Sequence, residues 1–589
     1  MNLTRLLQMS PAEIGTRIQQ AFSKRWSKPP TCRLISSSVS PVFPELPPLD
    51  SLDPAKKIGM HRFDLLGYQD LDFGSPIDWH LDPVHGKRAP KIPWRQIPFL
   101  DFDQVGDHKI IWELNRHQHL VTLAQAGFRD EILDQWTHWR SENPYPIGIN
   151  WASTLEVAFR TLSWLWVRHL IGDFHPDLLP ALHLHGWYIE RFLSTYFSPN
   201  THLLGEGVAL FAIGTMCPQI AEAHRWQKRG WQIVLKQAET QVRPDGFHFE
   251  QSVYYHIYAL DFFRFTRDLA ARNAIPIPAL LDKTIEKMTE ALAFLSQAGR
   301  PQNFGDDDGG RVIVGHRSSP AADVHVGPFA LSSAGIYAMT SANSQLFIDA
   351  GPQGALAAGH GHADALSIQL ITAGRPVLID PGTFCYVCPE RDRFRGTAAH
   401  NTLQVDGRDQ ARPYGPFGWT NLPETTVDRW QTCETFDFFA GHHNGYHPVI
   451  HHRWVFGLKS KFWLVRDLVT EPRSLGGRHL LRLHWHFLDG RGIAILPPVG
   501  HSWVQSIEPW DWSPVYGKKE PAFVLRFSTE TSLPADFAVL LVPGAPGTFT
   551  QTAPGAYRYD EPQASHEFIF GDRFVYRATG PAGDTEFSL

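Results

Sequence analysis

The spacing of apolar residues divides the chain into a helical part and a β part. Apolar residues recur at three- and four-residue intervals in the segments 110–127, 153–172, 178–197, 208–242 and 254–273. Each segment is followed by Gly, Pro, Asn or Asp, so the pattern predicts consecutive helices joined by short loops. Such helices pack as antiparallel hairpins, and we expect them to form an (α/α) toroid, an incomplete ring of hairpins.

The pattern changes after residue 311. Short runs in which apolar and polar residues alternate are broken by turn residues, which is typical of an antiparallel β-sandwich. These runs cover 344–351, 366–382, 401–410, 451–469, 479–490, 522–529, 536–544 and 566–580. Because the helices come first and the strands afterwards, we expect a multidomain α+β protein. We place the toroid at 106–315 and the sandwich at 316–589.

Residues 1–105 fit neither pattern. Residues 1–26 are predicted to form a basic amphipathic helix, and proline is frequent from 28 to 100, so we expect an arm packed on the toroid. The N-terminus lacks the continuous apolar segment and cleavage site of a secretory signal. No run approaches the roughly 20 apolar residues that a membrane span needs. We therefore expect no transmembrane segment and a cytoplasmic location by default, with a periplasmic location as the alternative.

The composition argues against nucleic-acid binding and favours a sugar ligand. The 589-residue chain has a net charge of −6, from 60 acidic and 54 basic residues, so no basic surface for nucleic acid is expected. It contains 20 Trp, 15 Tyr and 38 Phe. Most of these fill the core, but Trp and Tyr also join an apolar face to a polar group, which suits stacking on sugar rings.

The five cysteines are too few and too scattered for a disulfide framework. Cys385 and Cys388 form a CxxC pattern, but no second pair follows at zinc-finger spacing. We interpret the pattern as a structural coincidence.

Polar residues at two predicted helix starts fit either a structural or a chemical role. Asn200 could cap a helix, and His202 and Glu206, four residues apart, could form a surface pair. Tyr255 and Tyr258 are three residues apart and project from one helix face. They fit either a buried aromatic stripe or a site of proton transfer.

The acidic segment Asp306-Asp307-Asp308 lies at the expected domain junction, followed by Arg311. It resembles a calcium loop, but its spacing does not fit an EF-hand. We therefore favour a turn held by an Asp–Arg pair.

The segment 360–366, HGHADAL, carries two closely spaced histidines. On a strand, His360 and His362 would point to the same face. Asp380 and His400 lie at the ends of neighbouring predicted strands. Two imidazoles and one carboxylate fit a tetrahedral zinc site with one further position. A catalytic base and a polar strand edge are the alternatives for this segment.

Five motifs, in this order, resemble the heparinase II/III-like polysaccharide lyases, which include heparinases, heparan-sulfate lyases and related alginate lyases. The motifs are NTHLLGE, DGFHFEQSVYYH, GHGHADALSIQL, LIDPGTFCY and FRGTAAHNTLQVDGRDQ. The resemblance covers about residues 110–570 and implies an (α/α) toroid followed by an antiparallel β-sandwich. It also implies β-elimination at a uronic acid. One side chain neutralises the C6 carboxylate, a base removes the C5 proton, and an acid protonates the leaving glycosidic oxygen.

The resemblance implies roles for individual residues. Tyr255 corresponds to the catalytic tyrosine, and His202 is placed to act on the C5 proton or the carboxylate. His360 corresponds to the catalytic histidine that reaches the cleft from the sandwich. The structural zinc of the family would be bound by His362, Asp380 and His400, which leaves Asp364 with a structural role.

One departure from the family pattern concerns the group that neutralises the carboxylate. Many members carry Asn directly before the toroid histidine, whereas this chain has the order Asn200-Thr201-His202. Either Asn200 reaches in from one residue earlier, or His202 neutralises the carboxylate itself. The expected substrate-binding residues are Glu206, Arg160, Tyr258 and Arg311. Glu206 would also orient the catalytic groups, and a buried ion pair is the alternative for Arg160.

Two other functions remain open. A glycoside hydrolase would need paired carboxylates, for which Glu206, Glu250 and Asp306–Asp308 are the candidates. The other alternative is a non-catalytic protein of glycan binding or exopolysaccharide assembly. For the leading hypothesis we expect an acidic polysaccharide as the partner, and the low net charge disfavours a highly sulfated one. A homodimer is left open.

Overall fold

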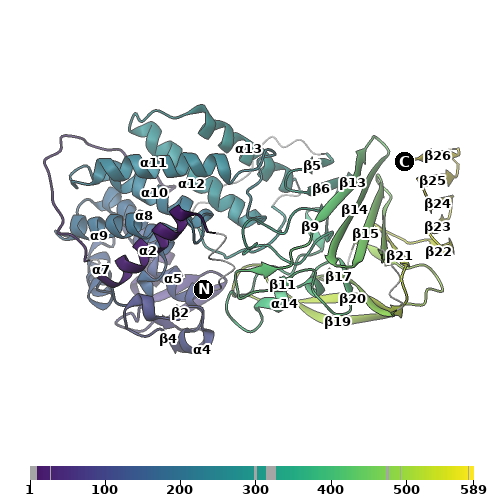
Figure 1. The fold of residues 1–589 in the computed structure, drawn as a ribbon, viewed down its shortest axis with the longest axis horizontal. Coiled ribbons are helices and arrows are strands. Elements are labelled where there is room, and N and C mark those ends of the chain that lie inside the picture. The colour runs from purple at the N-terminus through teal and green to yellow at the C-terminus, as the bar shows by residue number, and fades with distance from the viewer. Residues whose placement is uncertain are drawn as a thin grey trace.

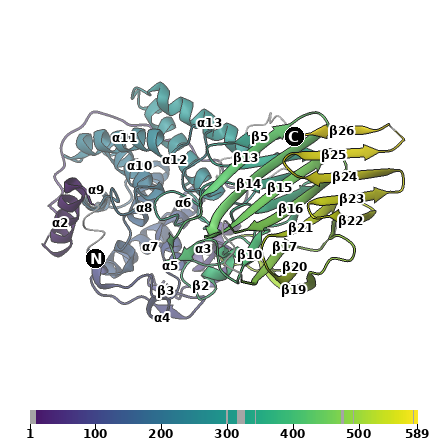
Figure 2. The same cartoon turned by 45° about the vertical axis from the view of Figure 1, so that its right-hand side comes forward.

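Helices occupy one side of the molecule and sheets the other (Figures 1 and 2). The computed structural model describes residues 9–26, 28–297, 301–313, 327–341, 343–471, 477–490, 492–581 and 583–589. The chain completes its helical part before it enters the sheets, and its C-terminal strands lie at the end farthest from the helices. The prediction of a helical part followed by antiparallel sheets is confirmed.

The helices of the first part form an open toroid, and the described residues contain no closed barrel. They are α4 (Phe102–Val105), α5 (His108–Asn115), α6 (Gln118–Gln125), α7 (Arg129–Glu142), α8 (Thr154–Ile171), α9 (Leu178–Arg191), α10 (Thr201–Met216), α11 (Ala223–Thr240), α12 (Val253–Arg272) and α13 (Ala279–Leu295), with the 3-10 turns η1 (Trp94–Gln96) and η2 (Ile149–Trp151). Helix α10 is buried along almost its whole length and packs against α8, α11 and α12. It touches α11 through glycines, since a Cβ at Gly214 would lie 2.2 Å from the backbone nitrogen of Gln227.

Three predicted helical segments are wrong in their extent, and one of them, 178–197, forms a helix only to Arg191. The segment 110–127 is divided into α5 and α6 because His117 adopts a left-handed backbone with φ of 59°. Such a conformation is unfavourable for a non-glycine residue inside a helix. The segment 208–242 contains the end of α10, a turn and then α11.

The N-terminal arm lies on the helical part. It contains α2 (Pro11–Trp26), α3 (Asp53–Gly59), the hairpin of β1 (Arg62–Leu65) and β2 (Tyr68–Asp72), and the hairpin of β3 (Leu81–Asp82) and β4 (Lys87–Arg88). The Gln20 side chain donates to the carbonyl of Leu193 at 2.9 Å, and Arg17 donates to that of Tyr196 at 3.1 Å. Among the described helices, none combines the length and apolar content that crossing a membrane requires.

The described residues of the second part form three large antiparallel sheets and the small hairpin of β11 (Arg412–Pro413) and β12 (Trp419–Thr420). The first is ordered β19 (Val504–Trp512), β20 (Glu520–Thr531), β17 (His479–Phe487), β9 (Arg375–Leu378), β8 (Ile368–Thr372), β7 (Ser344–Asp349), β6 (Ile336–Ser341) and β5 (Phe329–Leu331), with β10 (Leu403–Val405) beside β17. The second is ordered β13 (Thr425–Thr432), β14 (Phe436–Tyr446), β15 (Val449–Leu458), β16 (Phe462–Thr470), β21 (Ala535–Val542) and β18 (Ala494–Leu496). The third runs in chain order through β22 (Thr548–Ala553), β23 (Ala556–Glu561), β24 (Ala564–Phe570), β25 (Phe574–Thr579) and β26 (Thr585–Ser588).

Two apolar layers hold these sheets together. Residues such as Leu346, Trp463 and Trp485 fill the layer between the first and second sheets, which form the predicted sandwich. Phe456 and Phe568 belong to a further layer between the second and third sheets. The third sheet is therefore an addition to the sandwich that the alternating runs predicted.

Loops of the first sheet meet the helical part through hydrogen bonds of the main chain. The backbone N–H of Asp306 donates to the carbonyl of His360 at 2.8 Å, and the Ser252 hydroxyl donates to the carbonyl of Asp306 at 2.6 Å. Farther along the junction, Gly67 N–H donates to the carbonyl of Tyr516. Residues from both parts are thus fixed relative to one another where the chemical groups gather.

Candidate active site and metal cluster at the junction

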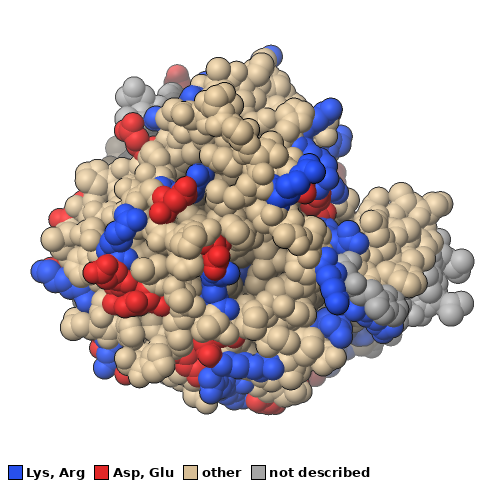
Figure 3. All heavy atoms as spheres, turned by 90° about the vertical axis from the view of Figure 1, so that its left-hand side faces the viewer, with Lys and Arg blue, Asp and Glu red and all other residues tan. Residues whose placement is uncertain are grey.

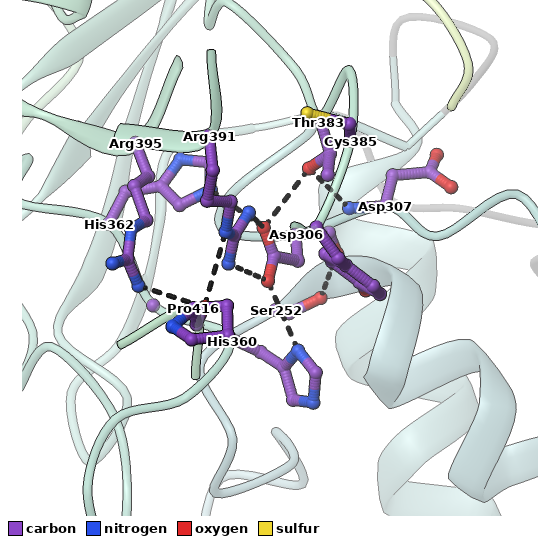
Figure 4. Close-up of polar contacts among 12 residues, drawn as sticks. Ser252, Asp306, Asp307, His360, His362, Thr383, Cys385, Arg391, Arg395 and Pro416 are labelled. Atoms are coloured by element: carbon purple, nitrogen blue, oxygen red, sulfur yellow. Dashed lines mark hydrogen bonds and ion pairs between the residues drawn. The ribbon is translucent and has the colours of Figure 1, made fainter. Parts of the chain in front are cut away.

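The carboxylate of Asp306 is the centre of a buried cluster at the junction (Figure 4). Arg391, the first residue of α14 (Arg391–Arg395), binds both oxygens of this carboxylate. His360 Nδ1 lies 3.1 Å from Oδ2, and His362 Nε2 lies 3.2 Å from Oδ1. Burial alone would raise the pKa of Asp306, but the Arg391 charge and the histidine hydrogen bonds hold that pKa well below its usual range. Asp306 is therefore ionised and fixes the orientation of both histidines.

The turn of the acidic segment is held by an Asp–Arg pair, as predicted, but the arginine is not the one that follows in the sequence. It is Arg391, which is 85 residues away in the chain. Asp308 instead forms an ion pair with Lys109, with 3.0 Å between Asp308 Oδ2 and Lys109 Nζ. The Arg311 side chain is exposed, and its carbonyl accepts from Gln118. Sequence spacing could not identify Arg391 because the contact forms only when the two parts of the chain meet.

His360 and His362 lie in a turn that precedes β8 and not on a strand. Gly361 between them has no room for a side chain, because a Cβ would lie 1.6 Å from the carbonyl oxygen of Gln353. His360 stacks on Tyr255 with ring centroids 3.7 Å apart, and its Nε2 lies 3.7 Å from Glu250 Oε2. The two histidines therefore share a partner in Asp306 but face different groups with their other nitrogens.

Tyr255 enters the cluster from the first turn of α12. Ser252 caps this helix by accepting from the Tyr255 N–H at 3.1 Å. The Tyr255 hydroxyl lies 2.9 Å from the hydroxyl of Tyr386, which comes from the segment between β9 and α14. Burial, reinforced by the charges of Asp308 and Asp306, raises the pKa of Tyr255 well above its ordinary value. Tyr255 is a neutral phenol at rest, which suits an acid.

Asn200 and His202 approach from the start of α10. The Asn200 side chain caps this helix by accepting from His202 N–H at 3.1 Å, and its amide donates to Glu250 Oε2 at 2.8 Å. Glu250 also accepts from Thr201 N–H at 3.1 Å. Burial lowers the pKa of the His202 imidazole to about 4, and repulsion from His360 adds to this effect. His202 is therefore neutral near pH 7 and able to accept a proton.

The predicted substrate-binding residues are less well placed than the predicted catalytic ones. Glu206 is fully buried and accepts from Ser194 N–H at 2.7 Å and from its hydroxyl at 2.6 Å, so Ser194 occupies both of its oxygens. Arg160 is also fully buried, where it donates to the carbonyls of Asn115 and Asn150 and lies over the ring of Trp139. Because its acceptors are carbonyls, this position favours neither the expected carboxylate clamp nor the alternative ion pair, and both stay predictions.

The Tyr258 hydroxyl accepts a hydrogen bond from Arg116, a residue that the sequence patterns did not identify. Arg116 Nη1 donates to it at 3.1 Å and binds both oxygens of Glu156. Tyr258 also stacks on Tyr255 with centroids 5.7 Å apart. Arg116 precedes the left-handed residue that separates α5 from α6, and no motif marked it. This buried cation lies beneath the tyrosines and supports them from the helical side.

Two further features of the cluster were missed. Tyr386 is the last residue of the motif LIDPGTFCY, but we assigned it no role, although it contacts the predicted catalytic tyrosine. Cys385 and Cys388, whose spacing we interpreted as a coincidence, are joined by a disulfide on either side of Tyr386. Among the described residues, Cys32, Cys217 and Cys433 remain free.

A second cluster lies directly behind His360 and contains His362, Asp364, Asp380 and His400. One ligand atom from each residue lies within 4.8 Å of those from the other three, and all four residues are buried. The three predicted metal ligands are thus brought together. Asp364, for which we expected a purely structural role, joins them as a fourth donor.

The tautomers of the two histidines leave one nitrogen of each without a hydrogen in this cluster, where the four residues could hold a metal ion. His400 Nδ1 donates to the carbonyl of Gly396 at 2.8 Å, and His362 Nε2 donates to the Asp306 carboxylate. The remaining nitrogens, His362 Nδ1 and His400 Nε2, face each other at 3.1 Å. Two lone pairs at this distance repel unless a proton or a metal ion lies between them. Tetrahedral zinc places neighbouring nitrogen ligands about 3.3 Å apart, so the donor set fits zinc.

Comparisons with known proteins cover both parts of the chain. Residues 53–306 match the sequence model described as "Heparinase II/III N-terminus", and residues 325–527 match "Heparinase II/III-like, C-terminal". A heparin-sulfate lyase of Pedobacter heparinus is 24% identical over 493 residues, which cover 75% of this chain and 69% of the relative. A heparin-sulfate lyase of Bacteroides stercoris is 22% identical and covers 68% of this chain and 65% of the relative.

Solved structures share the fold. A crystal structure of heparinase III has a TM-score of 0.67 at 15% identity and covers 98% of this chain and 95% of its own. A heparan sulfate lyase structure from Pedobacter heparinus has a TM-score of 0.55 at 21% identity, with 98% and 94% covered. Both support the arrangement of a toroid followed by a β-sandwich.

Proposed function

This chain belongs to the heparinase II/III-like family and is a polysaccharide lyase; we propose that it cleaves a uronate-containing glycan by β-elimination at the junction cluster. The observation that carries the proposal is the stacking of Tyr255 on His360 at 3.7 Å. It places a phenol from the helical part and an imidazole from the sandwich in one buried site. Heparin-sulfate lyases are among its relatives, and an acidic polysaccharide is the proposed substrate class.

The proposed mechanism follows from the protonation states. Neutral His202 removes the C5 proton, and the electron pair of the broken C–H bond moves into the adjacent carboxylate system. The Asn200 amide donates a hydrogen bond to the substrate carboxylate, whose charge grows as the enolate forms, and His360 Nε2 lies beside it, 3.7 Å from Glu250. The C4–O bond then breaks, a C4–C5 double bond forms, and Tyr255 gives its proton to the departing oxygen.

Hydrolysis is less well supported by the same site because its carboxylates are already bound. Asp306 is held by Arg391 and two histidines, and Glu206 is held by Ser194. Glu250 accepts from Asn200 and Thr201. A glycosidase needs two carboxyl groups that are free to act on opposite sides of the bond.

A lyase screen tests the proposal. Purified protein is incubated with heparan sulfate, hyaluronan, chondroitin, alginate and bacterial exopolysaccharides, and the unsaturated product is followed by ultraviolet absorbance and mass spectrometry. We expect an unsaturated uronate at the new non-reducing end, and Tyr255→Phe and His360→Ala should abolish it. Tyr446→Phe and His442→Ala, which change a tyrosine and a histidine of the second sheet, serve as controls. Saturated products would indicate hydrolysis. If no glycan gave a product, the non-catalytic role in glycan binding or exopolysaccharide assembly would be the remaining hypothesis.

We also propose that zinc is the ion of the second cluster, bound by His362, Asp364, Asp380 and His400. The ion would supply structural stabilisation by fixing the segment that carries His360. Metal analysis of purified protein should give about one zinc per chain, and His400→Ala should lose it. A metal content near zero in folded wild-type protein would contradict this assignment and leave a shared proton between the two imidazoles.

A further inference from the structure

Tyr386 lies beside Tyr255 in a position that lets its hydroxyl act on the catalytic one. The two oxygen atoms are 2.9 Å apart, and both side chains are buried. Tyr386 belongs to the segment between β9 and α14, whereas Tyr255 belongs to α12, so the contact joins the two parts of the molecule. Once Tyr255 has given up its proton, its oxygen can only accept, and Tyr386 must be the donor.

The backbone and ring of Tyr386 are held from several sides. The disulfide of Cys385 and Cys388 closes a short loop around it. Its backbone N–H donates to the Tyr516 hydroxyl at 2.9 Å, and Tyr516 in turn donates to Asp107 at 2.6 Å. Its ring meets that of Phe417 edge to face at 5.0 Å. With the backbone and ring fixed, the rotation of the hydroxyl is the main freedom left.

The Arg391 guanidinium gives the same ring a second link to the site. It lies 5.0 Å above the ring centroid of Tyr386 while it binds Asp306. Because Asp306 also orients His360, Tyr386 is linked to this proposed catalytic group through Arg391 and Asp306. Tyr386 is therefore well placed to influence the chemistry without touching the substrate.

We propose that Tyr386 is a positioning residue, which stabilises the Tyr255 phenolate formed when the glycosidic oxygen is protonated, and that the Cys385–Cys388 disulfide holds it in place. This inference rests on the proposed function. Its physical basis is that a buried phenolate without a donor is costly, whereas a charge-assisted hydrogen bond offsets part of that cost. Burial raises the pKa of Tyr255, and the hydrogen bond from Tyr386 acts in the opposite direction.

The disulfide makes the position of Tyr386 dependent on redox state. A dithiol reductant supplies two electrons and two protons, the S–S bond breaks, two thiols form, and the dithiol becomes a disulfide. The segment then loses its closed loop, and Tyr386 is free to leave Tyr255. We therefore expect activity to fall on reduction and to return on reoxidation.

The first experiment removes only the hydroxyl. Tyr386→Phe should lower kcat by about 10- to 100-fold with little change in KM, which corresponds to the loss of one hydrogen bond to a charged acceptor. Tyr446→Phe removes a buried hydroxyl that bonds to Leu403 in the sandwich, and it should leave kcat unchanged.

A substrate with an activated leaving group separates positioning from a merely structural role. A uronate that carries nitrophenolate at C4 departs without protonation, so the defect of Tyr386→Phe should disappear with it. An equal defect with both substrates, or an unchanged kcat with the glycan, overturns the inference. If wild-type protein forms no unsaturated product from any glycan, the proposed function itself has failed, which is a different result.

The second experiment tests the disulfide. Alkylation of the denatured protein should label the three free cysteines before reduction and all five afterwards. The Cys385→Ser/Cys388→Ser variant should show the same fall in kcat as Tyr386→Phe, with Cys433→Ser as the control. Treatment of wild-type protein with dithiothreitol gives a second measurement if the variant does not fold. Unchanged activity after complete reduction overturns the role of the disulfide.

Discussion

Replacing Asp306 by Asn tests whether one buried carboxylate holds the junction together. The side chains of Asp306 and Arg391 are 0% and 5% exposed, and the substitution removes the charge that Arg391 requires. Breaking a buried pair by removing one partner costs about 3–5 kcal/mol of unfolding free energy, because the other charge stays buried and uncompensated. The exposed pair of Arg393 and Asp511 offers a matched control, since its side chains are 36% and 34% exposed. Asp511→Asn should cost only about 0–1 kcal/mol.

Urea unfolding at pH 7, followed by tryptophan fluorescence, measures both losses. The Asp306→Asn/Arg391→Met variant should recover part of the loss because no unpaired charge remains. The depressed pKa of Asp306 also fixes the sign of the pH dependence. Its stabilisation is present above the ordinary carboxyl pKa and is lost as pH falls through the lower folded-state value, so the gap to wild type should narrow in acid. A loss no larger than that of Asp511→Asn would refute the central role of Asp306.

Three further outcomes follow from buried groups of the helical part. Burial raises the pKa of Glu206 to about 8, so the ionisation of this carboxyl lowers the stability of the wild-type fold as pH rises from about 4.5 to 8. Thermal unfolding should therefore show that Glu206→Gln becomes more stable relative to wild type over this pH range. The difference should level off above pH 8. Arg160→Met should lower the unfolding free energy by about 1–3 kcal/mol and leave KM unchanged, whereas a raised KM would restore Arg160 as a substrate clamp. The pKa of His202 is about 4, so kcat should fall as pH drops through that value, and a fall near pH 6.5 instead would indicate that His202 is not the base.

The order of helices and sheets could be predicted because it depends on local periodicity, whereas the details that failed depend on contacts between distant segments. Arg391, which binds Asp306, and Arg116, which binds Tyr258, are separated from their partners by 85 and 142 residues. Glu206 and Arg160 lie on helices that are buried on almost every face, so helical spacing alone could not distinguish the wall of a cleft from the core.

The charge of the molecule illustrates the same limit. The net charge of −6 says little about where charges lie. Figure 3 shows one face of the helical part, on which acidic and basic side chains are interspersed among larger uncharged areas. This face presents no broad surface of one sign. The buried charges that matter for the proposed chemistry lie at the junction and contribute nothing to that surface.

One segment of the sandwich links the metal cluster to the proposed acid. The stretch from the end of β9 to the start of α14 contains Asp380, the Cys385–Cys388 disulfide with Tyr386, and Arg391. Asp380 belongs to the proposed zinc site, Tyr386 contacts Tyr255, and Arg391 binds Asp306. Loss of the ion or of the disulfide should therefore disturb the same catalytic groups from opposite ends of one segment.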